Sequence, residues 1–166
     1  EHAIGVSAAM GAMARHFGAD EEYWKAVGYL HDYDYEQFPE EHLHHTAEPL
    51  REAGVDEESI RAILSHGWEF CTDVKPETDM EKSLFTVDEL TGLVGATARM
   101  RPGGLSDLEV SSVKKKFKDK RFAAKIDRAV IQQGCDMLGM DLADVIGLCI
   151  EGMRTEMDAL GLGPKE

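Results

Sequence analysis

The stretch GYLHDYDYEQFPEEHL, residues 28–43, places a histidine and an aspartate side by side at the end of an apolar helical run. Successive side chains of a regular helix point in different directions, so His31 and Asp32 would not face the same point from within one. At a helix end the backbone can leave α geometry, and both side chains can then turn toward one metal ion. The alternative is that the pair only decorates the end of the helix.

The segments on both sides of this stretch carry apolar residues at helical spacing. Helices are expected over residues 3–17, 20–32, 39–54, 56–67, 80–100, 106–119, 121–138 and 142–160. Pro39 can begin the third of these helices, and Pro49 must bend or interrupt it. The expected N-caps are Asp56, Ser106 and Asp141. No long β-alternation occurs, so the sequence predicts a compact all-α bundle of about seven or eight helices.

The length of 166 residues and the hydrophobic content of 43% are enough for one domain with its own core. We expect a single domain over residues 1–166, with a metal-site core over 1–100 and C-terminal helices over 105–160 packed on it. No apolar run is long enough to cross a membrane, and the chain does not open with the basic region of a signal peptide. The three cysteines match no disulfide framework and no CxxC metal pair, which favours a cytoplasmic location.

The formal net charge of −14 argues against general nucleic-acid binding, because a phosphate backbone would be repelled. That charge is uneven, since residues 99–128 carry ten Lys or Arg against four Asp or Glu. The centre of this basic segment is KKKFKDKR, residues 114–121. A solvated helix face is its ordinary interpretation. The sharper hypothesis is that it recruits a substrate phosphate through Lys114, Lys115, Lys116, Lys118 and Arg121.

Histidine and carboxylate side chains stand out as the candidates for chemistry, because neither a Gly-rich phosphate loop nor a GxSxG elbow is present. Six of the seven histidines lie in the first 45 residues. Asp88 lies within SLFTVDELTGL, residues 83–93, on a helix expected to be mostly buried, where a carboxylate is costly unless it is paired or binds a ligand. An exposed position beside Glu89 is the alternative. A divalent ion could be held between helices by two imidazoles and two carboxylates, namely His2, His31, Asp32 and Asp88.

The order His…His-Asp…Asp, with YLHDYDYE after an apolar helix and VDELTGL inside a later one, resembles the HD-domain metal-dependent phosphohydrolase superfamily. The chain is most similar to a bacterial group of small stand-alone HD proteins. Their sequences read like LLHDIDYE, ADELTGLI and RP…SVKKKFKDKSFA. The similarity runs from His2 to about Ala124. It implies that the all-α bundle is a single HD domain.

The resemblance implies that one divalent transition metal, Mn, Fe, Ni or Zn, is bound by four residues: His2, His31, Asp32 and Asp88. Members with two metal ions have extra histidines between the HD pair and the last aspartate. His42 and His66 match these positions, and His45 is the substitute for His42 if Pro49 shifts the helix. Asp34, which follows the HD pair, has no role in this pattern.

The resemblance also implies a function, which is the hydrolysis of a phosphomonoester or phosphodiester in a nucleotide or other small phosphorylated molecule. Asp32 would orient or deprotonate the attacking water while also binding metal. Two other functions are left open, which are a non-catalytic HD scaffold that binds a nucleotide or a partner, and a di-iron HD oxygenase. Assembly into a homodimer is also left open.

Overall fold

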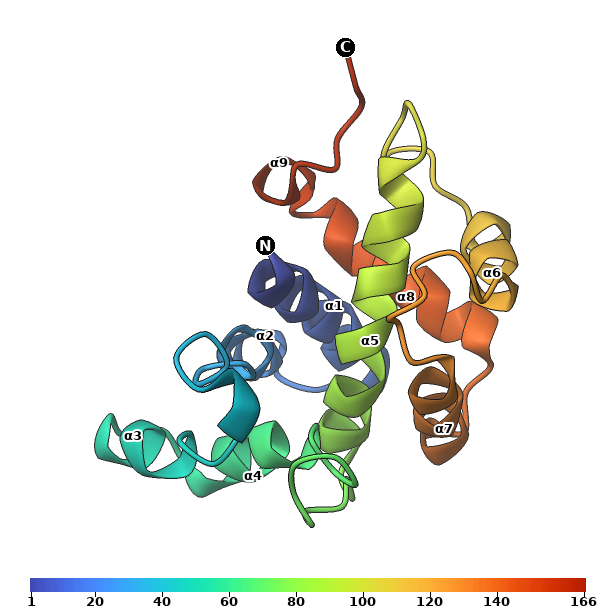
Figure 1. The fold of residues 1–166 in the computed structure, drawn as a ribbon. Helices are drawn as coiled ribbons and strands as arrows, with labels where there is room; N and C mark the ends of the chain where they lie inside the picture. Colours follow the sequence, from blue (N-terminus) through green and yellow to red (C-terminus); the bar gives the residue numbers. More distant parts are fainter.

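The longest helix, α5 (Asp79–Arg99), runs through the middle of the molecule in the computed structural model, which describes residues 1–166 (Figure 1). A capping box begins this helix: the Glu81 backbone N–H donates to the Thr78 hydroxyl, and the Glu81 carboxylate accepts from the Thr78 backbone N–H. Other helices cover α5 on several sides, so most of its residues are buried. Residues in the middle of α5 therefore face the interior of the bundle.

The first two helices, α1 (His2–Phe17) and α2 (Glu21–Leu30), form a helical hairpin that packs against α5. Gly18 ends α1 in the left-handed conformation, with φ 67°, and Asp20 caps α2 by accepting from the Tyr23 backbone N–H. The two helices approach closely at Gly28, where a Cβ atom would lie 3.0 Å from the Ser7 Cα atom. This close approach brings the end of α2 next to the start of α1.

Two shorter helices, α3 (Ala47–Glu52) and α4 (Glu57–Ser65), complete the N-terminal half. The C-terminal helices pack on α1 and α5: they are α6 (Val110–Lys118), α7 (Arg128–Leu138), α8 (Leu142–Arg154) and α9 (Met157–Leu160). One hydrophobic core cluster includes residues from both halves of the chain. The single domain over residues 1–166, with its metal-site core over residues 1–100, stays a prediction.

The predicted all-α class is confirmed, since the structure has nine α-helices and no strand. Seven of the nine have at least nine residues. Asp56 and Asp141 occupy the N-cap positions of α4 and α8, as expected, although neither side chain makes a capping hydrogen bond. No helix combines the length and the apolar composition that crossing a membrane requires.

The expected helix over 39–54 is wrong in its first half. Only a 3-10 turn, η1 (Pro39–Glu41), forms there, and α3 begins at Ala47. The chain between them is irregular because the buried Asp34 carboxylate accepts from the His45 backbone N–H, which satisfies that donor outside a helix.

Three other expected boundaries are also wrong. The helix expected from 106 begins at Val110, because the Ser106 hydroxyl donates to the Gly103 carbonyl in a turn instead of capping α6. The helix expected from 121 begins only at Arg128, whose guanidinium donates to backbone carbonyls of residues 116–126 and so satisfies them without a helix. The helix expected over 142–160 ends where the Thr155 hydroxyl donates to the Gly152 carbonyl, and α9 follows as a separate turn of helix.

Candidate metal centre

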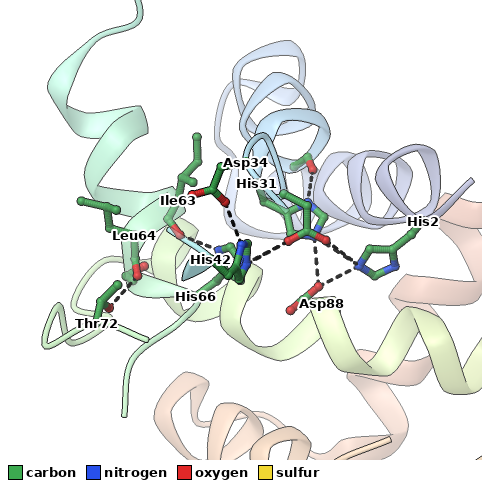
Figure 2. Close-up of polar contacts among 12 residues, drawn as sticks. His2, His31, Asp34, His42, Ile63, Leu64, His66, Thr72 and Asp88 are labelled. Atoms are coloured by element: carbon green, nitrogen blue, oxygen red, sulfur yellow. Dashed lines mark hydrogen bonds and ion pairs between the residues drawn. The ribbon is translucent and has the colours of Figure 1, made fainter. Parts of the chain in front are cut away.

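Six imidazole and carboxylate side chains converge where the start of α1, the ends of α2 and α4, and the middle of α5 meet (Figure 2). They are His2 on α1, His31 and Asp32 at the end of α2, His42 after η1, His66 at the end of α4 and Asp88 on α5. Three of these histidines occupy C-cap positions. A C-cap residue is the last one before the chain turns away, so its side chain can reach a point that two or more helices share.

The first group is formed by His2, His31, Asp32 and Asp88, whose candidate ligand atoms all lie within 4.8 Å of one another. The Asp88 Oδ1 atom lies 2.9 Å from His2 Nε2 and 3.0 Å from His31 Nε2. The Asp32 Oδ2 atom lies 3.2 Å from His31 Nε2 and 3.6 Å from His2 Nε2. Two imidazole nitrogens and two carboxylate oxygens thus surround one small volume.

The second group shares Asp32 with the first. The other carboxylate oxygen of this residue, Oδ1, lies 3.2 Å from His42 Nε2 and 3.5 Å from His66 Nε2. The two imidazole nitrogens are 3.1 Å apart. Asp32 therefore presents one oxygen to each group and lies between them.

The second ring nitrogens of the buried histidines fix which nitrogen faces the cluster. His31 Nδ1 donates to the Gly28 carbonyl at 2.6 Å, and His66 Nδ1 donates to the Ile63 carbonyl. These carbonyl acceptors require a proton on Nδ1, so in the neutral ring Nε2 is unprotonated and directs its lone pair toward the cluster. This is the tautomer in which a histidine binds a metal ion through Nε2.

Asp34 does the same for His42. The buried Asp34 carboxylate accepts from His42 Nδ1 at 2.9 Å and from the His45 backbone N–H at 3.0 Å. Burial raises the pKa of Asp34, but hydrogen bonds from the backbone of Leu43 and His45 and from the His42 ring outweigh it and keep this pKa low. In the neutral ring His42 Nε2 therefore also faces the cluster as an acceptor, whereas without a cation there the Asp32 and Asp34 carboxylates outweigh burial and raise the pKa of His42. Two lone pairs 3.1 Å apart, on His42 and His66, repel each other unless a cation or a proton lies between them.

The two carboxylates of the cluster, Asp32 and Asp88, have no Lys or Arg partner and therefore attract a cation. Burial raises the pKa of Asp32 and of Asp88, but hydrogen bonds with the surrounding histidines outweigh it and hold both pKa values well below the ordinary range. Burial lowers the pKa of His31, and the two carboxylates reverse this and raise it to about 10. No Lys or Arg forms an ion pair with either carboxylate. The donor set of imidazole and carboxylate therefore fits a divalent transition metal.

The sequence model of the HD domain family matches residues 1–90, which include all six of these side chains. The chain belongs to the HD domain family. This places it in the superfamily of HD metal-dependent phosphohydrolases, as the sequence motifs predicted. No curated protein and no solved structure gives a significant match.

The six ligands expected of this HD domain therefore lie together, which makes metal binding geometrically feasible, and binding itself stays a prediction. His45, the substitute for His42, lies outside both groups, because its ring stacks on Phe38 at a centroid distance of 3.7 Å and it pairs with Glu41. Asp34 is the residue whose role the motif did not supply. An acid two residues after the HD pair was visible in the sequence, but the fold of the loop is needed to show that it contacts His42.

The basic residues expected to receive substrate phosphate are not brought to the metal centre. Lys115 and Lys116 line a separate cavity between α5 and α6, and Lys114, Lys118 and Arg121 are exposed. None of the five contacts the His and Asp cluster. Their part in binding the substrate stays a prediction.

The cluster is open on two sides. A cavity of about 170 Å³ reaches His42, His66 and Asp88 and is bordered by Phe70 and Glu89. The Glu89 carboxylate accepts from the Asp127 backbone N–H, which fixes the turn before α7 at the rim. On the other side, a cavity of about 270 Å³ reaches His2 and runs along three glycines to an arginine: Gly5, Gly92, Gly95 and Arg99. Small molecules can reach the centre from either side.

Proposed function

We propose that this HD domain is a metal-dependent phosphohydrolase that cleaves the phosphoester of a small phosphorylated molecule, with two divalent metal ions. The observation that carries the proposal is the position of Asp32, which directs one carboxylate oxygen into each of two ligand groups. A carboxylate shared in this way is the arrangement that a two-metal hydrolase needs, because both ions must act on one substrate.

The residues divide into two sets around this shared carboxylate. His2, His31 and Asp88 would hold one ion, and His42 and His66 would hold the other. Divalent ions in these positions supply polarisation of a phosphoryl oxygen and acidification of a water molecule. Manganese, iron, nickel and zinc all suit imidazole and carboxylate ligands, so the donor set favours no single one of them.

Asp32 is better suited to orienting the attacking water than to removing its proton. A general base works best with a pKa near the operating pH, and the pKa of Asp32 is held far below that range by three histidines. His31 is fully buried, and the hydrogen bond from its Nδ1 atom to the Gly28 carbonyl fixes the orientation of its ring. The Nε2 atom of this ring contacts Asp32 Oδ2 and so fixes the position of that oxygen. The chain would thus contribute a preorganised set of metal ligands and, in Asp32, an acceptor for the attacking water.

A nucleotide is our preferred substrate class. Phe70 borders the cavity beside His42 and His66 and leaves 67% of its surface exposed, so its ring offers a face on which a nucleobase can stack. Stacking contributes about 1–3 kcal/mol per base, which corresponds to about 5- to 150-fold in affinity. A substrate without an aromatic base would gain no stacking on Phe70.

The test is phosphate release by the metal-loaded protein from aryl phosphates, nucleoside phosphates and ribose 5-phosphate. We expect hydrolysis that a chelator abolishes and that Asp32→Asn reduces by at least about 100-fold. Glu36→Gln, which removes a nearby exposed carboxylate, should retain the rate. Absence of hydrolysis across the panel with both metal groups loaded would refute the proposal, and oxygen consumption by an iron-loaded sample would instead indicate a di-iron oxygenase. Phe70→Ala should weaken binding of a nucleoside phosphate while sparing ribose 5-phosphate.

A further inference from the structure

The cavity between the C-terminal end of α5 and α6, which is separate from the two cavities at the metal centre, has a volume of about 460 Å³. The residues that line it are Thr97, Met100, Arg101, Ser112, Lys115, Lys116 and Asp119. Only one of these side chains is hydrophobic, whereas three carry a positive charge and one a negative charge. The lining therefore has an excess of positive charge within a protein whose net charge is −14.

Two of its three cationic groups, Lys115 and Lys116, have no carboxylate partner within the protein. The ammonium of Lys116 lies 4.5 Å from the centre of the Phe122 ring, and neither Lys115 nor Lys116 has a carboxylate within 4.0 Å. Arg101 approaches the Ser112 hydroxyl at 3.4 Å, while its Nε atom is buried without a hydrogen-bond acceptor, 3.5 Å from the Asp107 carboxylate. The two lysines without a carboxylate partner, together with the unsatisfied Nε of Arg101, leave positive charge that an external anion can neutralise.

The cavity is separated from the metal centre by α5 itself. Thr97 follows Asp88 by nine residues, which is a rise of about 14 Å and a rotation of about half a turn. The cavity therefore lies on the opposite face of α5 from the metal ligand. Figure 1 shows α6 beside the upper half of α5, on the side away from α2. One phosphate cannot bridge the two positions.

We propose that this cavity is a second anion-binding site, which takes a phosphorylated small molecule independently of the metal centre. Guanidinium and ammonium groups together with a hydroxyl are the donors that proteins use for phosphate oxygens. The hollow shape favours a compact ligand over a polymer, and the acidic surface elsewhere on the protein opposes a nucleic acid. Two lysines of the basic segment KKKFKDKR, Lys115 and Lys116, thus serve a site of their own.

The test is a titration of the zinc-loaded protein, residues 1–166, with inorganic phosphate, followed by two-dimensional amide NMR. We expect amides of residues 97–101 and 112–119 to shift and saturate together. In the variant Lys115→Gln/Lys116→Gln this set should saturate at phosphate concentrations about tenfold higher or more, since each ammonium donates a charge-assisted hydrogen bond. Arg101→Gln, which removes the third cation, is an independent variant with the same expected result.

The matched control is Lys114→Gln/Lys118→Gln, which removes the same charge from the same helix at exposed positions outside the cavity. Its affinity should stay within about threefold of the original, because exposed charges are screened by salt. Equal weakening in both double variants would overturn the proposal, as would shifts confined to residues around Asp88 or no saturation at millimolar phosphate. Phosphate bound at the metal centre would shift a different set of amides, so this result is independent of the proposed hydrolase function.

Discussion

Replacing Asp34 by asparagine should weaken one of the two metal groups and leave the other intact. The Asp34 carboxylate accepts from His42 Nδ1 at 2.9 Å and from the His45 backbone N–H at 3.0 Å, and it is buried. Asparagine has nearly the same shape, but it has one oxygen acceptor where the carboxylate has two. Either His42 or the His45 backbone then faces an amide NH₂ group, so the His42 ring loses its fixed orientation.

The size of the effect follows from the bond that is lost. A buried hydrogen bond to a charged group contributes about 1.5–3 kcal/mol, which is about 10- to 150-fold in an equilibrium constant. Changes to residues that orient a metal-binding histidine weaken metal affinity by about 10- to 100-fold. We therefore expect the ion at His42 and His66 to bind about 10- to 100-fold more weakly in Asp34→Asn.

The assay is competition with a chromophoric zinc chelator, which resolves the two binding steps of the purified protein. Glu36→Gln is the matched control, because it removes a carboxylate two residues away at an exposed position. The other ion, at His2, His31 and Asp88, should keep its affinity within about threefold in both variants. Our reasoning is refuted if Asp34→Asn leaves both affinities unchanged, or if it weakens both ions equally.

Three further predictions concern the centre and its support. Because the pKa of His31 is about 10 without metal, the imidazole is protonated at pH 7 and must lose its proton to bind an ion. The affinity for the metal ion should therefore rise by up to about tenfold per pH unit from about pH 6.5 toward 10. Calorimetry in two buffers should detect the release of this proton, and absence of release would contradict the assignment of His31 as a metal ligand. Gly28→Leu should destabilise the protein by about 1–3 kcal/mol in urea unfolding, because its Cβ atom would lie 3.0 Å from the Ser7 Cα atom; unchanged stability would mean that the hairpin can separate freely. His45→Ala should leave the metal stoichiometry unchanged, since the His45 ring stacks on Phe38 outside both ligand groups. Loss of an ion in this variant would show that His45 is a metal ligand.

The helices that the sequence predicted well are those with an uninterrupted apolar stripe and a local end signal. Gly18 ends α1 and the acids that follow begin α2, so these boundaries depend on neighbours in the sequence. The failures occur where a distant side chain satisfies the backbone. Arg128 holds the carbonyls of the preceding turn, and Asp34 holds the loop that leads to α3, and no local pattern reveals either contact.

Four candidate ligands, His2, His31, Asp32 and Asp88, could be argued from the residues themselves, whereas His42 and His66 were named only through the resemblance to HD proteins. His31 and His66 lie where helices stop, and Asp88 lies in the middle of α5. The location of the basic segment could not be predicted in the same way. Its lysines follow the metal ligands in the sequence motif, but the packing of α6 on the opposite face of α5 separates them in space.

We propose that two ions sharing Asp32 make this HD domain a phosphohydrolase. The most direct measurement is the rate of phosphate release as metal-free protein is titrated with manganese, with the metal content per chain determined at each point. We expect no release without metal and a rate that reaches its maximum when two ions are bound per chain. Full activity in the metal-free protein, or no release from any of the tested phosphates with two ions bound, would contradict it.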